Sequence, residues 1–590
     1  MTLRIRASIP LALAAAIAAG AVQDDAAPID WIRKNAIPLT GVRAGGDRDD
    51  LSPLRKLIGD ARIVSLGEAT HGTREMFELK HRLLEFLAMD MGFTVFSIEA
   101  NMPEAYRLND YVLNGTGDPA ELLRGLYFWT WNTEEVLDMI RWMRAFNASG
   151  KGRIQFTGFD MQTPTVALEI VRDFVSRHDP EYAPAVREAS TRAATARPAS
   201  SGPGFGLASA SLPGTLVAGK RIRFSGYIRS EDVTDGHAGL WWRVDGTSGI
   251  IALDNMNDRG AVGTTEWKRY EINMTVDAAA KAVIFGALMP GKGTAWFDDL
   301  SLEIDDIPYA GDSRFDFGFE SDSVKGFFTG GRGYAVGLDS EVAHGGKKSL
   351  RMKGGPPPVE PTASRPGDAA ASWGEVIAHL EAGRAKYRAA GATEQAIEWA
   401  TQNARLVQQA MTAMTDPLAR DRSMATNVAW ILDQNPGAKV VLWAHDGHVA
   451  AGGVNHETMG TNLRARYGAQ MVVFGFAFNQ GSFRAVELGV AKIRDFTLPP
   501  APAGSLDAAL AAARVPLFAL DLRNAPPWFR QERKSRQIGA GFSDANANAY
   551  LMALQPSAAF DALLFIDTTT ASRKAPSPVP AGTPGPSPGR

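Results

Sequence analysis

The stretch RIVSLGEATHGTREMFELKHRLLEFLAMDM (62–91) decides the fold of this chain. It opens with RIVSLGE (62–68), a short apolar and β-branched run of the kind that forms buried parallel strands. It continues into residues 74–91, where apolar positions recur with helical spacing and charged residues occupy the opposite face. The stretch therefore predicts a strand, a turn and a helix in direct succession, with Glu68 and His71 in or beside the turn.

Short apolar segments of the same kind recur along the chain, at 93–99, 153–160, 439–445, 470–477 and 561–567. Helical patterns lie between them, for example at 133–146 and 165–175. Alternation of strands and helices implies an α/β fold with a mainly parallel sheet flanked by helices.

The composition changes after about residue 197, where ARPASSGPGFG has the character of a linker. From there, short alternating runs separated by turn signals favour a β-sandwich. A second linker at 354–372 closes this insert, and helical patterns resume after it. We therefore expect an inserted sandwich with its linkers at 198–371, between α/β parts at 28–197 and 372–570.

The two ends of the chain differ from the rest. Residues 1–21 carry Arg4 and Arg6, an apolar stretch and a small-residue end, which is the pattern of a cleavable secretory signal. A retained N-terminal anchor is the alternative interpretation. Residues 571–590 are rich in Pro, Gly and Ser, which favours a disordered tail. We therefore expect an exported protein, either periplasmic or extracellular.

The composition also limits the chemistry. The chain has 590 residues, a formal net charge of −3 and no cysteine. This charge gives no reason to expect nucleic acid or an anionic membrane as a partner, and no later run is long enough for stable membrane insertion. The lack of cysteine excludes disulfides, zinc–thiolate sites and cysteine catalysis.

Titratable residues end four of the predicted strands, namely Glu68, Glu99, Asp160 and His445. His71 follows Glu68 by three positions, and His448 follows His445 by three. Because ligands bind beyond the carboxyl ends of parallel strands, we expect all six side chains to converge in one cleft.

Most of these residues also have a structural interpretation. Glu68 and Glu99 could cap the helices that follow them, and Asp160 could be a turn residue. His445 and His448 could be core histidines with satisfied hydrogen bonds.

The turn after the first strand offers further candidates. His71, in the sequence THG, is the residue hardest to explain structurally. Arg74 could place a cation against a developing oxyanion, or it could only pair with Glu78. Glu75 is a further candidate for substrate binding or support.

A histidine beside a carboxylate can act as a general base. Glu68 would fix the tautomer of His71, and the second histidine pair could bind a carbonyl or protonate a leaving group. A G-x-S-x-G nucleophile motif is missing. We therefore expect attack of an activated water on an acyl carbon, without cofactor or metal. A metal-dependent hydrolase that uses the same His/Glu set is an alternative.

Three quoted stretches carry a family resemblance: LGEATHGTREMFELKHRLLEFLAMDMGFTVFSIEA (66–100), GFDMQ (158–162) and VVLWAHDGHVA (440–450). They resemble the erythromycin esterase family, over roughly residues 30–195 and 372–567. Characterised members open the lactone ring of macrolide antibiotics. The resemblance implies His71 as the base with Glu68 as its partner, His445 and His448 as further active-site residues, and a small ester or lactone as substrate.

The insert has a resemblance of its own. GLWWRVDG (239–246) and AWFDDLSLEI (295–304) resemble carbohydrate-binding jelly rolls, and residues 315–355 resemble the start of such a module. Because the segment that usually begins such a module here follows its apparent end, we infer a circularly permuted jelly roll. Three tryptophans could stack on sugars or could belong to the core, namely Trp241, Trp242 and Trp267. The resemblance makes a glycan a candidate partner, and a non-catalytic glycan-binding protein with a vestigial cleft is the alternative function.

Overall fold

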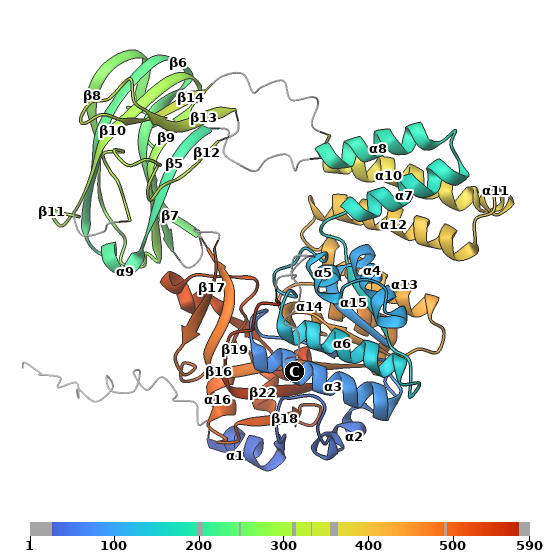
Figure 1. Cartoon of the computed structure of the whole chain (residues 1–590). Helices are drawn as coiled ribbons and strands as arrows, with labels where there is room; N and C mark the ends of the chain where they lie inside the picture. Colours follow the sequence, from blue (N-terminus) through green and yellow to red (C-terminus); the bar gives the residue numbers. More distant parts are fainter. Residues whose placement is uncertain are drawn as a thin grey trace, which may run out of the picture. The chain divides into compact units, whose positions relative to one another are not determined.

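The computed structural model describes residues 26–196, 205–246, 249–309, 314–331, 333–354, 364–488 and 492–576 (Figure 1). The predicted signal sequence at 1–21 lies outside these residues. The chain divides into two compact units. The first comprises Met1–Thr163, Leu418–Phe542 and Ala547–Arg590, and the second comprises Pro164–Pro417 and Ser543–Asn546.

In the described residues, the first unit is built on a ten-stranded sheet with the order β1-β18-β22-β16-β2-β15-β3-β4, and β17 and β20 pair with β16. The bounds are β1 Ile37–Pro38, β2 Ile63–Leu66, β3 Val95–Asn101, β4 Gln155–Asp160, β15 Val440–Trp443, β16 Met471–Glu487, β17 Lys492–Leu498, β18 Leu517–Asp521, β20 Gly541–Phe542 and β22 Ala562–Thr569. The strands from β22 to β4 run parallel. The six predicted strands are therefore present, and the predicted mainly parallel sheet is confirmed.

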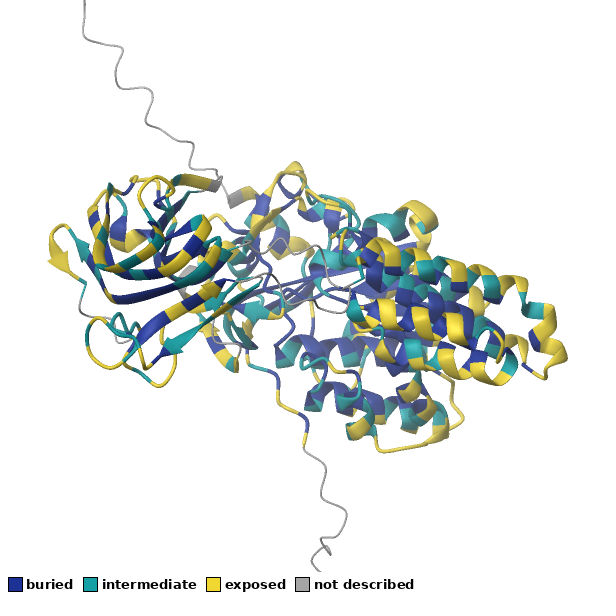
Figure 2. Ribbon diagram, turned by 90° about the horizontal axis from the view of Figure 1, so that it is seen from above, coloured by how far each residue is buried: buried dark blue, intermediate teal, exposed yellow. Residues whose placement is uncertain are grey.

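Helices flank this sheet, with the bounds α1 Ala26–Asn35, α2 Leu54–Ile58, α3 Arg74–Met91, α4 Met102–Asn114, α5 Pro119–Arg124, α6 Glu134–Ala148, α13 Ala419–Gln434, α14 Asp446–Val449, α15 Met459–Tyr467, α16 Leu506–Ala511 and α17 Pro556–Ala559. One core cluster joins the apolar faces of α3, α4 and α6 to alternate strand residues such as Val64, Phe96 and Val441. Figure 2 shows buried residues on the strands and on the inward faces of the helices. The helical periodicity of the sequence thus reports the face that packs on the sheet.

Two glycines let the turn between β2 and α3 approach its neighbours closely. A Cβ at Gly67 would lie 1.8 Å from Oδ1 of Asp446, and one at Gly72 would lie 1.9 Å from the carbonyl oxygen of Arg484. The amide of Arg484 also donates to the carbonyl of Gly72 at 2.9 Å. These contacts seat the turn that carries Glu68 and His71 against β16 and α14.

The chain beyond residue 570 is ordered further than we predict from its composition. Ala571 forms a β-bridge with Thr73, the amide of Ser572 donates to the carbonyl of Gly72, and Arg573 pairs with Glu135 at 2.9 Å. Residues 571–576 are therefore held by contacts with the starts of α3 and α6. The remainder of the predicted tail, 577–590, lies outside the described residues.

The second unit contains the inserted all-β domain, with β5 Phe205–Pro213, β6 Arg221–Gly246, β7 Gly249–Asp254, β8 Ala261–Thr275, β9 Ala282–Pro290, β10 Lys292–Ile304, β11 Ile307–Pro308, β12 Phe328–Gly330, β13 Tyr334–Asp339 and β14 Ser349–Gly354, and the short helix α9 Gly214–Val217. The long strand β6 pairs with β8 and β10 in its first part and with β7 and β9 in its last part. Phe224 from the first part contacts Phe285 of β9 with ring centroids 5.2 Å apart, so two layers enclose one core. The segment 315–355 supplies β12, β13 and β14, while the permuted jelly-roll topology stays a prediction.

Helices α7 Thr165–His178, α8 Ala183–Thr195, α10 Pro366–Ala382, α11 Arg384–Ala389 and α12 Glu394–Ala413 also belong to the second unit. The indole N–H of Trp373 on α10 donates to the carbonyl of Ala189 on α8 at 3.2 Å. The predicted end of the insert at 371 therefore falls inside α10, because this helix begins at Pro366 and packs against α8. In the described part of the chain, no helix combines the length and the apolar character that crossing a bilayer requires.

Candidate active site

The carboxyl ends of β2, β15, β3 and β4 lie next to one another in the sheet. Trp443, the last residue of β15, is in register with Leu66 of β2 on one side and Ile98 of β3 on the other. The structure thereby brings six of the predicted residues to one edge of the sheet: Glu68, His71, Glu99, Asp160, His445 and His448.

Glu68 is fully buried, and both of its carboxylate oxygens have partners. Oε1 lies 2.5 Å from Nδ1 of His71. Oε2 accepts from Nζ of Lys80 at 2.5 Å and from the indole N–H of Trp443 at 2.7 Å. Burial alone would raise the pKa of Glu68, but Lys80 and His71 lower it below its usual value. Glu68 is therefore an ionised acceptor, and Nδ1 of His71 carries the proton in their hydrogen bond.

The other ring nitrogen of His71, Nε2, has no hydrogen-bond partner among the described residues. The ring lies between aromatic neighbours, with centroids 5.7 Å from Trp131 and 5.1 Å from His445. The indole N–H of Trp131 donates to the carbonyl of Glu99 at 2.8 Å, which fixes this wall of the site. The geometry therefore leaves an oriented nitrogen lone pair available for a proton.

Both ring nitrogens of His445 are already engaged. Nε2–H donates to the carbonyl of Ile538 at 3.2 Å, and Nδ1 accepts from the amide of Gly447 at 3.1 Å. Burial, together with nearby His71 and His448, lowers the pKa of His445 to about 3. In this arrangement His445 is a neutral ring that supports the site and offers no free nitrogen.

Arg420 on α13 joins the carboxylates at the ends of β3 and β4. Its Nε and Nη2 donate to the two oxygens of Asp160 at 3.2 and 2.8 Å, and Nη2 also donates to Oε1 of Glu99 at 2.7 Å. The second oxygen of Glu99 accepts from the amide of His445 at 3.0 Å. Burial would raise the pKa of Glu99, but His448 and Arg420 hold it well below its usual range.

His448 sits between a carboxylate and the guanidinium group. Nδ1–H donates to Oδ1 of Asp421 at 2.9 Å, whereas Nε2 lies 3.0 Å from Nη1 of Arg420 and 3.5 Å from Oε1 of Glu99. The neutral ring accepts from Arg420, and the charged ring can donate to Glu99. Burial lowers the pKa of His448, but Glu99 and Asp421 together raise it above its usual value. The surroundings of His448 thus favour the charged form of its ring.

Two predicted residues, Arg74 and Glu75, form their hydrogen bonds with residues outside this cluster. Arg74 donates from Nε to Oε1 of Glu78 at 2.9 Å. This is the pairing that we gave as the alternative to a contact between Arg74 and a developing oxyanion. Glu75 accepts from the backbone amide and hydroxyl of Thr570, both at 2.6 Å. Among the described residues, neither side chain forms a hydrogen bond or ion pair with His71 or His448.

The sequence pattern does not single out four residues of the cluster, Lys80, Arg420, Asp421 and Asp446. Lys80 could be found from its helix, because it falls on the apolar stripe that includes Met76 and Leu83. Arg420 and Asp421 lie near the start of α13 in an ordinary charged run, and no local signal marks them. Asp446 is hidden between the two histidines of the H-x-x-H motif.

Asp446 is a buried carboxyl without a cationic partner in hydrogen-bonding distance among the described residues. It accepts from the amide of Phe476 at 3.2 Å and from Nε2 of Gln537 at 3.3 Å. Burial raises the pKa of Asp446 to about 7. Its protonation state therefore changes in the neutral pH range, beside Lys80 and Glu68.

Among the described residues, no three or more His, Asp or Glu side chains form a group that could hold a metal ion. In the cluster, the histidines and carboxylates pair with one another, as Glu68 does with His71 and Asp421 with His448.

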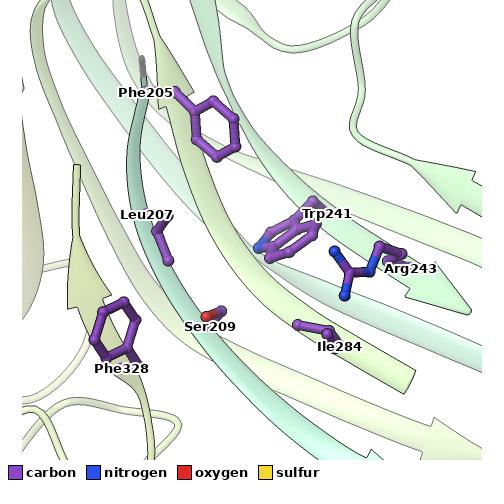
Figure 3. A pocket seen from close by; sticks show the side chains of 7 residues that line it. All are labelled: Phe205, Leu207, Ser209, Trp241, Arg243, Ile284 and Phe328. Carbon is purple, nitrogen blue, oxygen red and sulfur yellow. The ribbon is translucent and has the colours of Figure 1, made fainter. Parts of the chain in front are cut away.

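A second candidate site lies on the inserted domain, as Figure 3 shows. A pocket of about 420 Å³ is lined by Phe205, Leu207, Ser209, Trp241, Arg243, Ile284 and Phe328. Of the three predicted tryptophans, Trp241 lines this pocket, Trp242 is fully buried in the core, and Trp267 contacts His344 with ring centroids 5.6 Å apart. The core interpretation is therefore right for Trp242.

Comparisons with known proteins agree with this architecture. The sequence model of the family described as erythromycin esterase matches residues 88–212 and 358–569, more than half of the chain. The match begins within α3, after the turn that carries Glu68 and His71, and it includes the ends of β3, β4 and β15.

The erythromycin esterase type II of Escherichia coli is 35% identical over 156 residues, which are 26% of this chain and 37% of that protein. The chain spans about a third of the length of the curated relatives it matches.

Two solved structures share the fold. A protein from Bacillus cereus is 18% identical with a TM-score of 0.59, over 94% of this chain and 100% of that one. A mutant of erythromycin esterase EreC in its open conformation is 13% identical with a TM-score of 0.52, over 92% of this chain and 98% of that one. With the family match over more than half of its length, this chain belongs to the erythromycin esterase family.

Proposed function

We propose that this chain is a hydrolase that activates water for attack on an ester or lactone carbonyl, with His71 as the general base. One observation carries the proposal. Nδ1 of His71 is held by the buried carboxylate of Glu68, while Nε2 has no partner among the described residues. A histidine oriented in this way can take a proton from water and remain stabilised as an imidazolium by the carboxylate.

The reaction would proceed through proton transfers between residues of the cluster. The water oxygen attacks the acyl carbon as its proton passes to Nε2 of His71. The bond to the alkoxide then breaks, and that oxygen takes a proton from His448, whose pKa is raised by Glu99 and Asp421 although burial lowers it. The products are a carboxylic acid and an alcohol, which stay in one molecule when the substrate is a lactone.

The relatives support the choice of substrate class. The family is described as erythromycin esterase, and an erythromycin esterase of Escherichia coli is among the similar proteins. We include macrolide lactones among the candidate substrates for that reason. Export is also part of the proposal, and it rests on the residue pattern of 1–21 alone.

The test is turnover of p-nitrophenyl acetate and of a lactone panel by wild type and His71→Ala. We expect a loss of about 10²–10⁴-fold, the usual contribution of a general base. His456→Ala is the control, because His456 is exposed and, within the described part of the chain, its side chain bonds its neighbour Asn455 alone. Near wild-type turnover in a folded His71→Ala protein would remove His71 from the mechanism.

For the inserted domain we propose a second function, binding of a glycan in the pocket around Trp241. The pocket combines aromatic faces with polar groups from Ser209 and Arg243, and saccharide rings present both apolar faces and hydroxyl groups to such walls. The indole N–H of Trp241 and the Nε–H of Arg243 lack hydrogen-bond partners among the described residues. Titration calorimetry with an oligosaccharide panel should detect binding that Trp241→Ala abolishes. Absence of binding across the panel contradicts this function.

A further inference from the structure

Lys80 is placed where an ammonium group is costly. Its side chain is fully buried on α3, and Nζ lies 4.3, 5.2 and 6.0 Å from the ring centroids of Trp443, Phe476 and Phe77. Desolvation of a charge in such surroundings carries a large cost in free energy, which a single ion pair often fails to offset. A buried lysine at this point is therefore poorly explained by stability.

We propose that Lys80 is a positioning residue of the active site, whose ammonium keeps Glu68 ionised and thereby sets which nitrogen of His71 carries the proton. This inference rests on the proposed function, in which His71 accepts a proton at Nε2.

The hydrogen bonds of Glu68 show how Lys80 acts through it. Oε2 accepts from Lys80 and Trp443, and Oε1 accepts from Nδ1–H of His71. The carboxylate accepts on both oxygens in this way. Because Oε2 still accepts from the indole N–H of Trp443, a protonated Glu68 would carry its proton on Oε1 and offer this O–H to Nδ1 of His71. The imidazole proton would then move to Nε2, and the lone pair needed by the base would be lost.

Trp443 cannot replace Lys80 in this role. Its indole N–H is a neutral donor, whereas burial of a carboxylate favours the protonated form unless a charge opposes it. Lys80 is the group whose charge most strongly lowers the pKa of Glu68 against the effect of burial. Without the ammonium of Lys80, burial should therefore raise the pKa of Glu68 and favour its protonated form.

The charged groups around Lys80 come from several elements. Glu68 precedes α3, Glu99 lies in β3, and Asp446 begins α14; all three raise the pKa of Lys80. Burial nevertheless lowers it to about 8. Activity should therefore fall as the pH rises through about 8, because the ammonium is lost there.

The experiment follows the histidine ring nitrogens by magic-angle-spinning ¹⁵N NMR, with the His71 signals assigned by their loss in His71→Gln. In wild type at pH 7 we expect protonated Nδ1 and bare Nε2. In Lys80→Met the proton should move to Nε2, and turnover of p-nitrophenyl acetate should fall by about 10²-fold or more, as happens when an orienting carboxylate is neutralised. The double variant Lys80→Met/Glu68→Gln should be no slower than Glu68→Gln, because both changes act on one group.

The matched control is Arg82→Met on the same helix. Arg82 forms another buried ion pair, with Asp50 at 2.5 Å, so its loss tests general destabilisation. His71 should keep its tautomer in this variant. Lys80→Gln is the milder second variant if Lys80→Met does not fold. If neither variant folds, the ¹⁵N signals of His71 are followed in wild type as the pH rises through about 8. Deprotonation of Lys80 without any change in the tautomer of His71 overturns the proposal.

The outcomes also separate the two proposals. An unchanged His71 tautomer in folded Lys80→Met or Lys80→Gln overturns the role of Lys80, whatever the rates. A tautomer change without loss of turnover supports the action of Lys80 on Glu68 and His71 but contradicts His71 as the base.

Discussion

Replacement of Asp446 by asparagine should make the first unit more stable, and the gain should grow with pH. Asp446 is 1% exposed, and among the described residues its carboxyl accepts from two neutral donors, the amide of Phe476 and the side chain of Gln537. Its pKa is about 7 in the folded chain, against 3.8 as the ordinary value. Because the folded-state value is the higher one, its contribution to stability is fully present below pH 3.8 and is lost as the pH rises through 7.

The size of the effect follows from these two values. A carboxyl that titrates near 7 when folded and at 3.8 when unfolded couples to folding by about 4 kcal/mol. The asparagine side chain of Asp446→Asn would stay neutral at every pH, so the variant should match wild type near pH 4 and exceed it by up to about 4 kcal/mol above pH 7. At roughly 2 °C per kcal/mol, this is a difference in Tm of about 8 °C.

The assay is differential scanning calorimetry of wild type and Asp446→Asn between pH 4 and 9. Only the difference between the proteins matters, so other titrating groups cancel. Asp521→Asn is the control: burial raises the pKa of Asp521, but its bonds to Arg523 lower it overall. That control should lose a small amount of stability which stays constant above pH 5. A difference between Asp446→Asn and wild type that does not change with pH would refute the reasoning.

Three further perturbations test the turn, the arginine network and the insert. Gly72→Ala should greatly lower Tm, because the new Cβ would lie 1.9 Å from the carbonyl oxygen of Arg484. Gly41→Ala is the control and should leave Tm unchanged, because a Cβ there would have no atom within 4 Å. Equal Tm values for the two variants would contradict the close approach of Gly72 to Arg484. Arg420→Lys should cost about 2 kcal/mol in urea unfolding, since an ammonium cannot reproduce the paired bonds to Asp160; an unchanged midpoint would contradict this. Replacement of 197–363 by a flexible linker should leave a soluble chain that still hydrolyses p-nitrophenyl acetate, and an insoluble product would show that the core needs the insert.

The sequence by itself determined the elements of this protein. Short apolar runs and helical spacing identified the strands of the parallel sheet, because both patterns report local burial on one or two faces. The titratable residues near the carboxyl ends of β2, β3, β4 and β15 were predictable as a group, since all parallel strands end at one edge. The same periodicity could mark Lys80 as a charge on an apolar helix face.

Only the tertiary structure decided which residues meet and in which protonation state. β15, which follows the insert in sequence, lies between β2 and β3, and no local pattern encodes that order because strand pairing is set by contacts distant in sequence. The same holds for Arg420, which reaches Glu99 and Asp160 from α13. His445 and His448 have the same local spacing as Glu68 and His71, yet His445 has no free nitrogen, because the carbonyl of Ile538 and the amide of Gly447 occupy both. Burial and hydrogen bonding are properties of the folded environment, and they assign roles that residue type and spacing leave open.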